Sequence, residues 1–272
     1  MKGSEWNKWD LHIHSPMTWL ANKFTEPKDI QGFVKKLGES GVSLIGLTNY
    51  FFFADNEIEI IREEIKKQNL HIPVSPNIEL RVSQQNKKGE WINIHLIFSE
   101  SIPTERINEE LSTLPIATTS VSGKKVFCSQ KSLEQHGKDI ASITVDYSAV
   151  CQHMNSQFAF FSEMVLAVCP NGYGGFRAGT EGRSHEIATE FDKDGHIVLD
   201  GSEMKGALNS RDYFLNTGRY AGAVAMPVFR CSDAHDMDKI GTMFSWVKAK
   251  PTFEGLRQTL IEPAARLELD DN

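Results

Sequence analysis

The segment WDLHIH, residues 9–14, combines the apolar pattern of a buried strand with three polar side chains. Residues i and i+2 of a strand lie on the same face, so Asp10, His12 and His14 project together. Two imidazoles on one face can fill two positions around a divalent ion such as Zn²⁺, Mn²⁺ or Fe²⁺. The alternative is a pair of histidines that are hydrogen-bonded at the end of the strand.

The rest of the chain alternates short strand-like runs with helical stretches. We expect helices over residues 25–41, with Thr25 as N-cap, and over 55–69, with Asp55 as N-cap. This alternation predicts an α/β protein with a mostly parallel sheet, either open or closed into a barrel. Active sites of such sheets form at the carboxyl ends of the strands.

Composition limits the class of protein. The 272 residues include 40% hydrophobic residues and carry a formal net charge of −7. We predict a single domain over residues 1–272, with an inserted or irregular segment around 114–145. The acidic balance argues against a broad basic face for nucleic acid. The four cysteines form no CxxC pair, and no run is long enough for a membrane span, so we expect a cytoplasmic protein without membrane contact.

A second pair of metal-competent side chains lies near the other end of the chain. In CSDAHD, residues 231–236, Asp233 and His235 are again two positions apart and follow an apolar run. A carboxylate and an imidazole on one face form half of a metal site. The alternative is an aspartate that caps a helix, next to a surface histidine.

Two middle strands each carry one further candidate ligand. Glu79 ends IPVSPNIEL among apolar neighbours, where an unpaired carboxylate is costly, and a salt bridge to Arg81 is the alternative. His95 lies inside the apolar run INIHLIF, where a satisfied core histidine is the alternative. Because four separate strands end in such groups, one shared metal site is the more economical explanation.

These segments, taken in order, resemble the PHP (polymerase and histidinol phosphatase) superfamily. The matching segments are DLHIHS (10–15), GLTNY (46–50), NIEL (77–80), IHLIF (94–98) and CSDAHD (231–236). The resemblance implies a distorted (β/α)7 TIM-like barrel that binds two or three metal ions at its mouth and hydrolyses phosphoesters. LTNYFF and TFEGLRQTL further resemble the amino-terminal PHP domain of TrlF-like proteins, in which the barrel precedes an SMC-like ATPase.

The resemblance also implies a role for each matched residue. The implied metal ligands are His12, His14, Glu79, His95, Asp233 and His235. Glu79 would bridge the first and second ions, and His95 would bind the second. His235 would lie in the region of the third ion and is our candidate for proton transfer. We expect two divalent ions, either Zn, Mn or Fe.

The sequence departs from the family pattern in several places, and residues 17–20 lack the histidine that often follows the HxH pair. Asn49 and Tyr50 stand where family members carry an Asp-His pair, and Cys169 stands where they carry a histidine. We therefore expect a depleted third-ion site, where Asn49 is a weaker candidate ligand, and a second-ion site in which Cys169 is a candidate substitute ligand. The alternative for Cys169 is a small core residue.

Arginines after the apolar run MVLAVCP, residues 164–170, are candidates for binding phosphate. The loop NGYGGFRAGTEGR contains Arg177 and Arg183, which can grip a phosphate bidentately, and Arg230 precedes CSDAHD. A flexible loop with solvated arginines is the alternative.

We therefore predict a metal-dependent phosphoesterase that hydrolyses a phosphodiester in nucleic acid or a nucleotide. A nuclease in nucleic-acid processing or anti-phage defence, served by an SMC-like ATPase domain or subunit, fits the TrlF-like resemblance. One alternative is a degenerate barrel that acts as a regulatory or scaffolding module for that ATPase. An amidohydrolase, which also carries HxH on a barrel strand, is a third interpretation, but the late DxH pair fits PHP proteins better.

Overall fold

The computed structural model describes residues 5–24, 29–119, 123, 125–136, 143–159, 161–172, 174–176 and 182–269. The strands are β1 (Trp6–His14), β2 (Leu44–Tyr50), β3 (Val74–Gln85), β4 (Trp91–Phe98), β5 (Pro115–Thr119), β6 (Lys125–Phe127), β7 (Met164–Val168), β8 (Ile197–Asp200), β9 (Val228–Arg230), β10 (Ser245–Lys248) and β11 (Leu267–Glu268). The helices are α1 (Ile30–Ser40), α2 (Glu57–Lys67), α3 (Thr104–Leu111), α4 (Gln130–His136), α5 (Tyr147–Gln157), α6 (Gly182–Asp194), α7 (Met204–Leu215), α8 (Phe253–Ile261) and α9 (Pro263–Arg266).

One large sheet organises the described part of the chain, with the strand order β11-β10-β1-β2-β3-β4-β7-β8-β9. Between β1 and β9, β4 is antiparallel to both of its neighbours and the other pairs are parallel. Beyond β9, Ala234 forms a parallel bridge with Ile13 and accepts a hydrogen bond of 2.9 Å from the backbone N–H of His14. The sheet is thus a nearly closed barrel, as predicted at this level. A regular (β/α)7 repeat stays a prediction.

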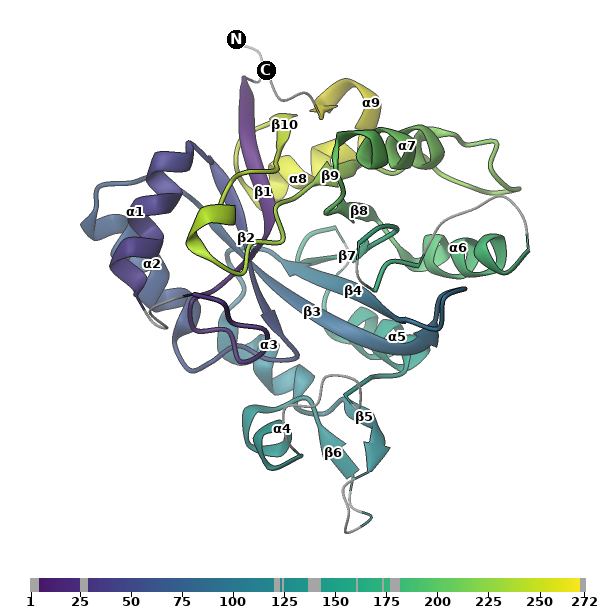
Figure 1. Ribbon diagram of the computed structural model, residues 1–272, viewed down its shortest axis with the longest axis horizontal. Helices are drawn as coiled ribbons and strands as arrows, with labels where there is room; N and C mark the ends of the chain where they lie inside the picture. The colour runs from purple at the N-terminus through teal and green to yellow at the C-terminus, as the bar shows by residue number, and fades with distance from the viewer. Residues whose placement is uncertain are drawn as a thin grey trace.

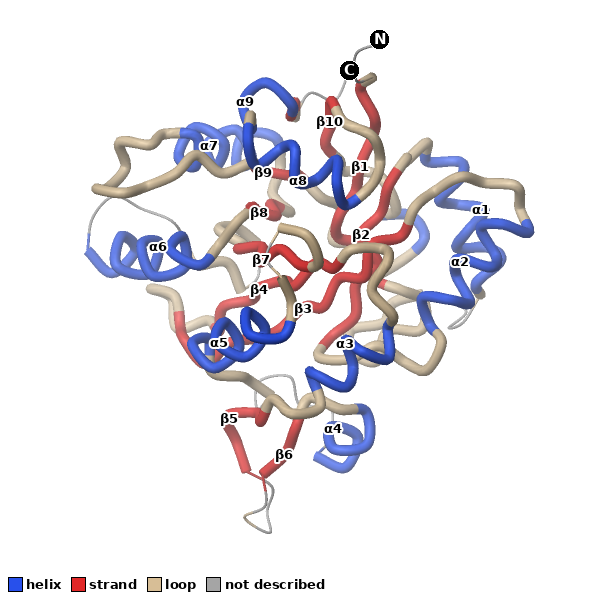
Figure 2. Tube along the Cα trace, turned by 180° about the vertical axis from the view of Figure 1, so that it is seen from behind, coloured by secondary structure: helices blue, strands red, loops and turns tan. Residues whose placement is uncertain are grey.

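Most helices lie on the outside of this sheet (Figure 2). In Figure 1, α1 and α2 cover the side of β1 and β2, while α6 and α7 lie on the opposite side of the barrel. β5 and β6 form a separate two-stranded sheet that lies with α4 away from the main sheet (Figure 1), and Val145 bridges both Ile116 of β5 and Val82 of β3. β5, β6 and α4 fall within the segment 114–145 that we expected to be irregular. None of the described helices is long and apolar enough to cross a membrane.

The first helix starts later than predicted. Asp29 is the N-cap of α1, and its Oδ1 accepts a hydrogen bond of 2.9 Å from the backbone N–H of Gly32. Thr25, the predicted cap, lies outside the described residues. Gly41 ends the helix in the left-handed conformation, with φ of 71°, which glycine adopts without steric cost.

The predicted cap of the second helix is wrong. Asn56, not Asp55, is the N-cap residue of α2, and it makes no side-chain capping bond. Instead, Oε2 of Glu57 accepts a hydrogen bond of 2.9 Å from the backbone N–H of Ala54. Glu57, the first helical residue, thus accepts the backbone hydrogen bond of this turn, and the helix starts later than expected.

The inner face of the barrel combines an apolar floor with polar side chains. Ile97 and Ala167 belong to one buried apolar cluster, and His95 shares their face because it lies two residues from Ile97 and pairs with Ala167. Glu79 pairs with His95 across the β3–β4 hairpin. The inward-facing polar side chains therefore lie beside a buried apolar cluster, and packing against this cluster fixes their positions.

Candidate metal centre

His12 and His14 lie at the carboxyl end of β1 and point into the barrel. Both are buried, and their Nε2 atoms lie 3.1 Å apart. The pairing of β1 with β2 is irregular between Asp10 and Ile13, which indicates a β-bulge just before the second imidazole. Bulges re-aim side chains next to functional sites.

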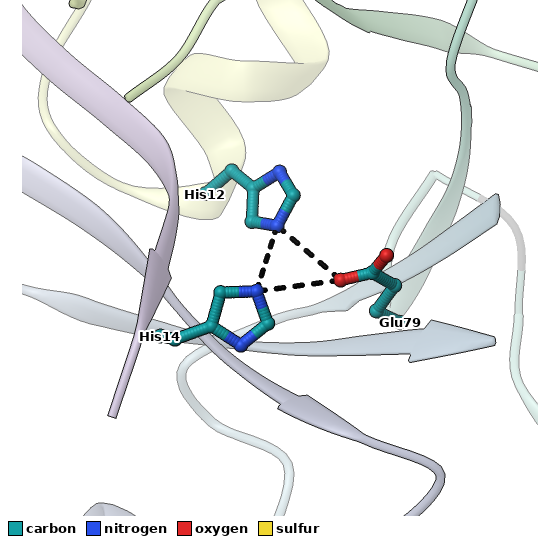
Figure 3. Close-up of side chains that lie close together, drawn as sticks. All are labelled: His12, His14 and Glu79. Atoms are coloured by element: carbon teal, nitrogen blue, oxygen red, sulfur yellow. Dashed lines mark hydrogen bonds and ion pairs between the residues drawn. The ribbon is translucent and has the colours of Figure 1, made fainter. Parts of the chain in front are cut away.

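Glu79 and Asp233 complete a four-atom cage with these histidines; Figure 3 shows its His12, His14 and Glu79 corners. Glu79 Oε2 lies 3.4 Å from His12 Nε2 and 3.3 Å from His14 Nε2. Asp233 Oδ1 lies 3.1 Å and 3.5 Å from the same two atoms. Four ligand atoms placed tetrahedrally about 2.1 Å from a zinc-sized ion are about 3.4 Å apart. The distance between the two imidazole nitrogens and the distances from each nitrogen to the two carboxylate oxygens match this spacing.

The electrostatics of the cage favour a positive charge at its centre. Burial alone would lower the pKa of His12, but the charges of Asp233 and Glu79 raise it to about 9. Burial opposes ionisation of Glu79, yet hydrogen bonds with His12 and His14 hold the pKa of its carboxyl well below the ordinary value. Either a proton shared among these groups or a bound cation would therefore balance the negative charge of the two carboxylates.

Asp233 has a strained backbone at the mouth of the barrel. Its φ is 50°, in the left-handed region that non-glycine residues seldom adopt, and its side chain is half exposed. Strain of this kind persists where the surrounding structure enforces it, and it clusters at functional sites. Here it turns the carboxylate back toward the two histidines.

His95 lies beside the cage rather than in it. Its ring meets the ring of His12 edge-on, with centroids 4.3 Å apart. Nδ1 is hydrogen-bonded to Oδ1 of Asn77 at 3.0 Å, and Nε2 is buried without a hydrogen-bond partner among the described residues. Burial, followed by the charge of His12, lowers the pKa of His95 to about 3. The imidazole is therefore neutral at physiological pH.

His235 forms a second metal-competent group with His14 and Asp233. Its Nδ1 donates to the backbone carbonyl of Asp233 at 2.9 Å, and its Nε2 lies 3.0 Å from the hydroxyl of Tyr50. The His235 ring also stacks on His14, with centroids 3.9 Å apart. Burial and the charge of His14 lower the pKa of His235 to about 4. The hydroxyl of Tyr50 is thus the hydrogen-bond partner of the second nitrogen of this imidazole.

The structure does not bring Asn49 to the cage. Its Oδ1 accepts hydrogen bonds from Thr18 Oγ1 and from the backbone N–H of Trp19 and Tyr50, at 2.8–3.3 Å. Its Nδ2 donates to Glu57 at 2.8 Å. The carboxamide thus ties the start of α2 to the loop after β1.

Of Cys169 and the two loop arginines, the structure describes only the side chain of Cys169. Cys169 lines the same cavity as the cage, and burial raises the pKa of its thiol well above the ordinary value. It belongs to neither of the two metal-competent groups found among the described residues. Arg177 lies outside the described residues, and Arg183 lies in α6 with a side chain that is not described.

A cavity of about 630 Å³ opens over the cage. The cationic side chains that line it are Lys23, Arg81, Arg230 and Lys239. Arg81 and Arg230 are buried, which makes their guanidinium groups pre-organised partners for an anion. The cavity therefore combines a metal-sized cage with basic walls.

Amide groups that were not predicted from the sequence support the candidate ligands. Asn93 Nδ2 donates to Glu79 Oε1 at 2.6 Å, and Asn93 Oδ1 accepts from Arg81 Nε at 3.2 Å. The predicted neighbours Glu79 and Arg81 are thus linked through Asn93. The spacing of Asn93 two residues before His95 places both on one face, and this pattern was available in the sequence.

Comparisons with known proteins do not assign a family. No family model and no curated protein matches the chain. A solved structure of a protein from Bifidobacterium adolescentis, proposed to be a metal-dependent phosphoesterase, aligns with a TM-score of 0.41 and 11% identity, over 94% of this chain and 96% of that chain. An amidohydrolase from Chromobacterium violaceum, solved with bound sulfate and without metal, aligns with a TM-score of 0.42 and 12% identity, over 84% and 87%. Both similarities are too low to carry an argument about activity.

Proposed function

We propose that this protein is a metal-dependent phosphoesterase of the PHP type, which hydrolyses a phosphodiester in nucleic acid or a nucleotide. The observation that carries the proposal is the cage of His12, His14, Glu79 and Asp233, in which the two imidazole nitrogens lie 3.1 Å apart and each lies 3.1–3.5 Å from both carboxylate oxygens. Two neutral nitrogens and two carboxylate oxygens suit Zn²⁺, Mn²⁺ or Fe²⁺. His95 is the ligand available to a second ion, in line with the two ions expected from the sequence.

The residues present fit a divalent cation. A cation held in the cage supplies Lewis-acid chemistry, which neutralises charge on a phosphoryl group and lowers the pKa of water. Arg81 and Arg230 line the cavity wall and are the candidates to bind and orient the phosphate. His235 is neutral at physiological pH, its Nε2 accepts a hydrogen bond from the hydroxyl of Tyr50, and it is the candidate for proton transfer.

The substrate and partner follow from the sequence resemblance. A TrlF-like barrel works beside an SMC-like ATPase, which would deliver nucleic acid to an acidic domain that binds it weakly by itself. We propose that the chain acts as one barrel domain in the cytoplasm, in nucleic-acid processing or anti-phage defence.

The test compares metal content and hydrolysis in matched variants. Metal in the purified protein is measured by elemental mass spectrometry for wild type, His12→Ala/His14→Ala, Asp233→Asn and, as a control outside the cage, His153→Ala. Bis-(p-nitrophenyl) phosphate and labelled single-stranded DNA are offered to each with added Mn²⁺. We expect bound metal and hydrolysis in wild type and His153→Ala, with both lost in the two cage variants.

Other outcomes select other functions. Bound metal without hydrolysis of any phosphoester would favour the degenerate regulatory barrel. Cleavage of a p-nitroanilide but not of the phosphodiester would favour an amidohydrolase. Wild-type protein without metal, even after reconstitution, would contradict the proposed function.

A further inference from the structure

The carboxamide of Asn77 connects three strands under the cage. Asn77 lies fully buried on β3. Its Nδ2 donates to the backbone carbonyl of Leu11 in β1 at 2.8 Å and to Oγ1 of Thr48 in β2 at 3.0 Å. Its Oδ1 faces Nδ1 of His95 in β4 at 3.0 Å.

The orientation of this amide is fixed by a group that can only accept a hydrogen bond. The carbonyl oxygen of Leu11 has no hydrogen, so the nitrogen of Asn77 must face it. Thr48 is compatible with this orientation because its hydroxyl donates to the carbonyl of Gly46 at 3.2 Å and so can accept from Asn77. Oδ1 therefore faces His95, and Nδ1 of His95 must carry the proton.

A neutral imidazole that is protonated at Nδ1 has its free lone pair on Nε2. In His95 this atom is buried and has no hydrogen-bond partner among the described residues. The ring lines the cavity and contacts His12 of the cage. An orphaned lone pair beside a metal-sized cage is the arrangement that a ligand for a further cation requires.

We propose that Asn77 is a positioning residue that holds His95 in the Nδ1-protonated tautomer, so that its Nε2 binds a second divalent cation. This inference rests on the proposed metal-dependent function and names the residue that prepares the second subsite. Asn77 lies two residues before Glu79 on the same face, so β3 supplies both a ligand of the cage and the support for its neighbour.

The tautomer is measured directly, without metal or substrate. Long-range ¹H–¹⁵N correlation spectra of metal-free protein with ¹⁵N-labelled histidine distinguish the two nitrogens of each ring. We expect wild type to show His95 protonated at Nδ1. Asn77→Leu removes the acceptor, and we expect a shift of His95 toward the Nε2-protonated form; Asn77→Ala serves the same purpose if the leucine variant does not fold.

Two further variants separate positioning from general damage. Thr48→Val removes the hydroxyl that contacts the same amide nitrogen but leaves the Leu11 and His95 contacts, so the tautomer should stay that of wild type. Asn77→Asp keeps an acceptor at Nδ1 and should restore the wild-type tautomer.

Metal binding supplies the second readout. Titration of metal-free protein with Zn²⁺ in a calorimeter should show two ions in wild type. In Asn77→Leu the dissociation constant of the second ion should rise by about 10- to 100-fold, while the first is unchanged.

The inference and the proposed function fail in different ways. An unchanged His95 tautomer in Asn77→Leu, an Nε2-protonated His95 in wild type, or a single ion per wild-type chain would each overturn the inference while leaving phosphodiester hydrolysis intact. Two ions and the expected tautomer change, with no hydrolysis of a phosphoester, would support the inference and contradict the proposed function.

Discussion

The carboxylate of Asp10 joins the two ends of the barrel. Its Oδ1 accepts a hydrogen bond of 3.1 Å from the backbone N–H of Ser232, which is 222 residues away in the chain. The same oxygen accepts from the backbone N–H of His12 at 3.3 Å. One buried oxygen thus positions the first and last segments of the cage relative to each other.

Removal of this carboxylate should destabilise the protein. Asp10→Ala leaves two buried N–H donors without their acceptor, and we expect the free energy of unfolding to fall by about 2 kcal/mol or more. Chemical denaturation of metal-free protein measures this. Thr242→Ala, which removes one exposed hydroxyl near the rim, is the control and should change little.

The charge on Asp10 should make stability depend on pH. Burial raises its pKa from an ordinary value of 3.8 to about 6. The folded state therefore binds the proton more tightly than the unfolded state, and stability falls as pH rises from about 4 through about 6. Asp10→Asn retains an acceptor without charge, so its stability relative to wild type should rise across that window, by an amount on the order of 3 kcal/mol. A pH-independent difference would contradict this assignment.

A bound ion should stabilise the fold through the cage. Zn²⁺ at about 100 times its dissociation constant adds about 2.7 kcal/mol to the free energy of unfolding. Asp233→Asn should lose most of this gain, since it removes one charged corner. Asparagine tolerates the left-handed backbone at this position, so the metal-free variant should melt close to wild type. Equal zinc-induced shifts of Tm in the two proteins would argue against the cage.

Gly46 should resist substitution because β1 lies directly against it. A Cβ at this position would lie 2.0 Å from the carbonyl oxygen of Leu11. Gly46→Ala should therefore separate β1 from β2 and cost about 2 kcal/mol or more in the free energy of unfolding. Gly201→Ala is the matched control, since its nearest described contact would be an ordinary 3.8 Å. Similar unfolding midpoints for the two variants would contradict this packing.

His196 should destabilise the fold in mild acid. Nδ1 accepts a hydrogen bond of 3.1 Å from the backbone N–H of Leu166, and burial lowers the pKa of His196 to about 4. The unfolded chain takes up this proton near pH 6.5, so the contribution of His196 is present above pH 6.5 and is lost as pH falls toward about 4. His196→Asn keeps an acceptor and should flatten that decline. Parallel stability curves for the two proteins would refute the assignment.

Local periodicity was sufficient for the main features of the fold. The i, i+2 spacing correctly placed His12 with His14, and the apolar runs at 91–98 and 164–170 correspond to β4 and β7. Helix starts were less accurate because capping depends on side-chain contacts that spacing does not encode. Asp29 and Glu57 provide those contacts where Thr25 and Asp55 were expected.

The support of the site depends on strand register, which a single sequence does not reveal. Asn93 reaches Glu79 only because β3 and β4 pair with Glu79 opposite His95. Asn49 matched a family ligand position, but Thr18 and Glu57 hold its amide away from the cage. Both outcomes depend on contacts between distant segments. Residue type and spacing therefore predicted the cage better than its surroundings.

The cage draws on both ends of the chain, and this has a consequence for the order of assembly. His12 lies in β1, whereas Asp233 follows β9, more than 200 residues later in the chain. A nascent chain that has not yet reached residue 233 lacks one corner of the cage, however well its earlier strands have folded. The complete cage thus forms only after residue 233 has been synthesised, and we expect a product truncated before this residue to retain metal less well than the finished barrel.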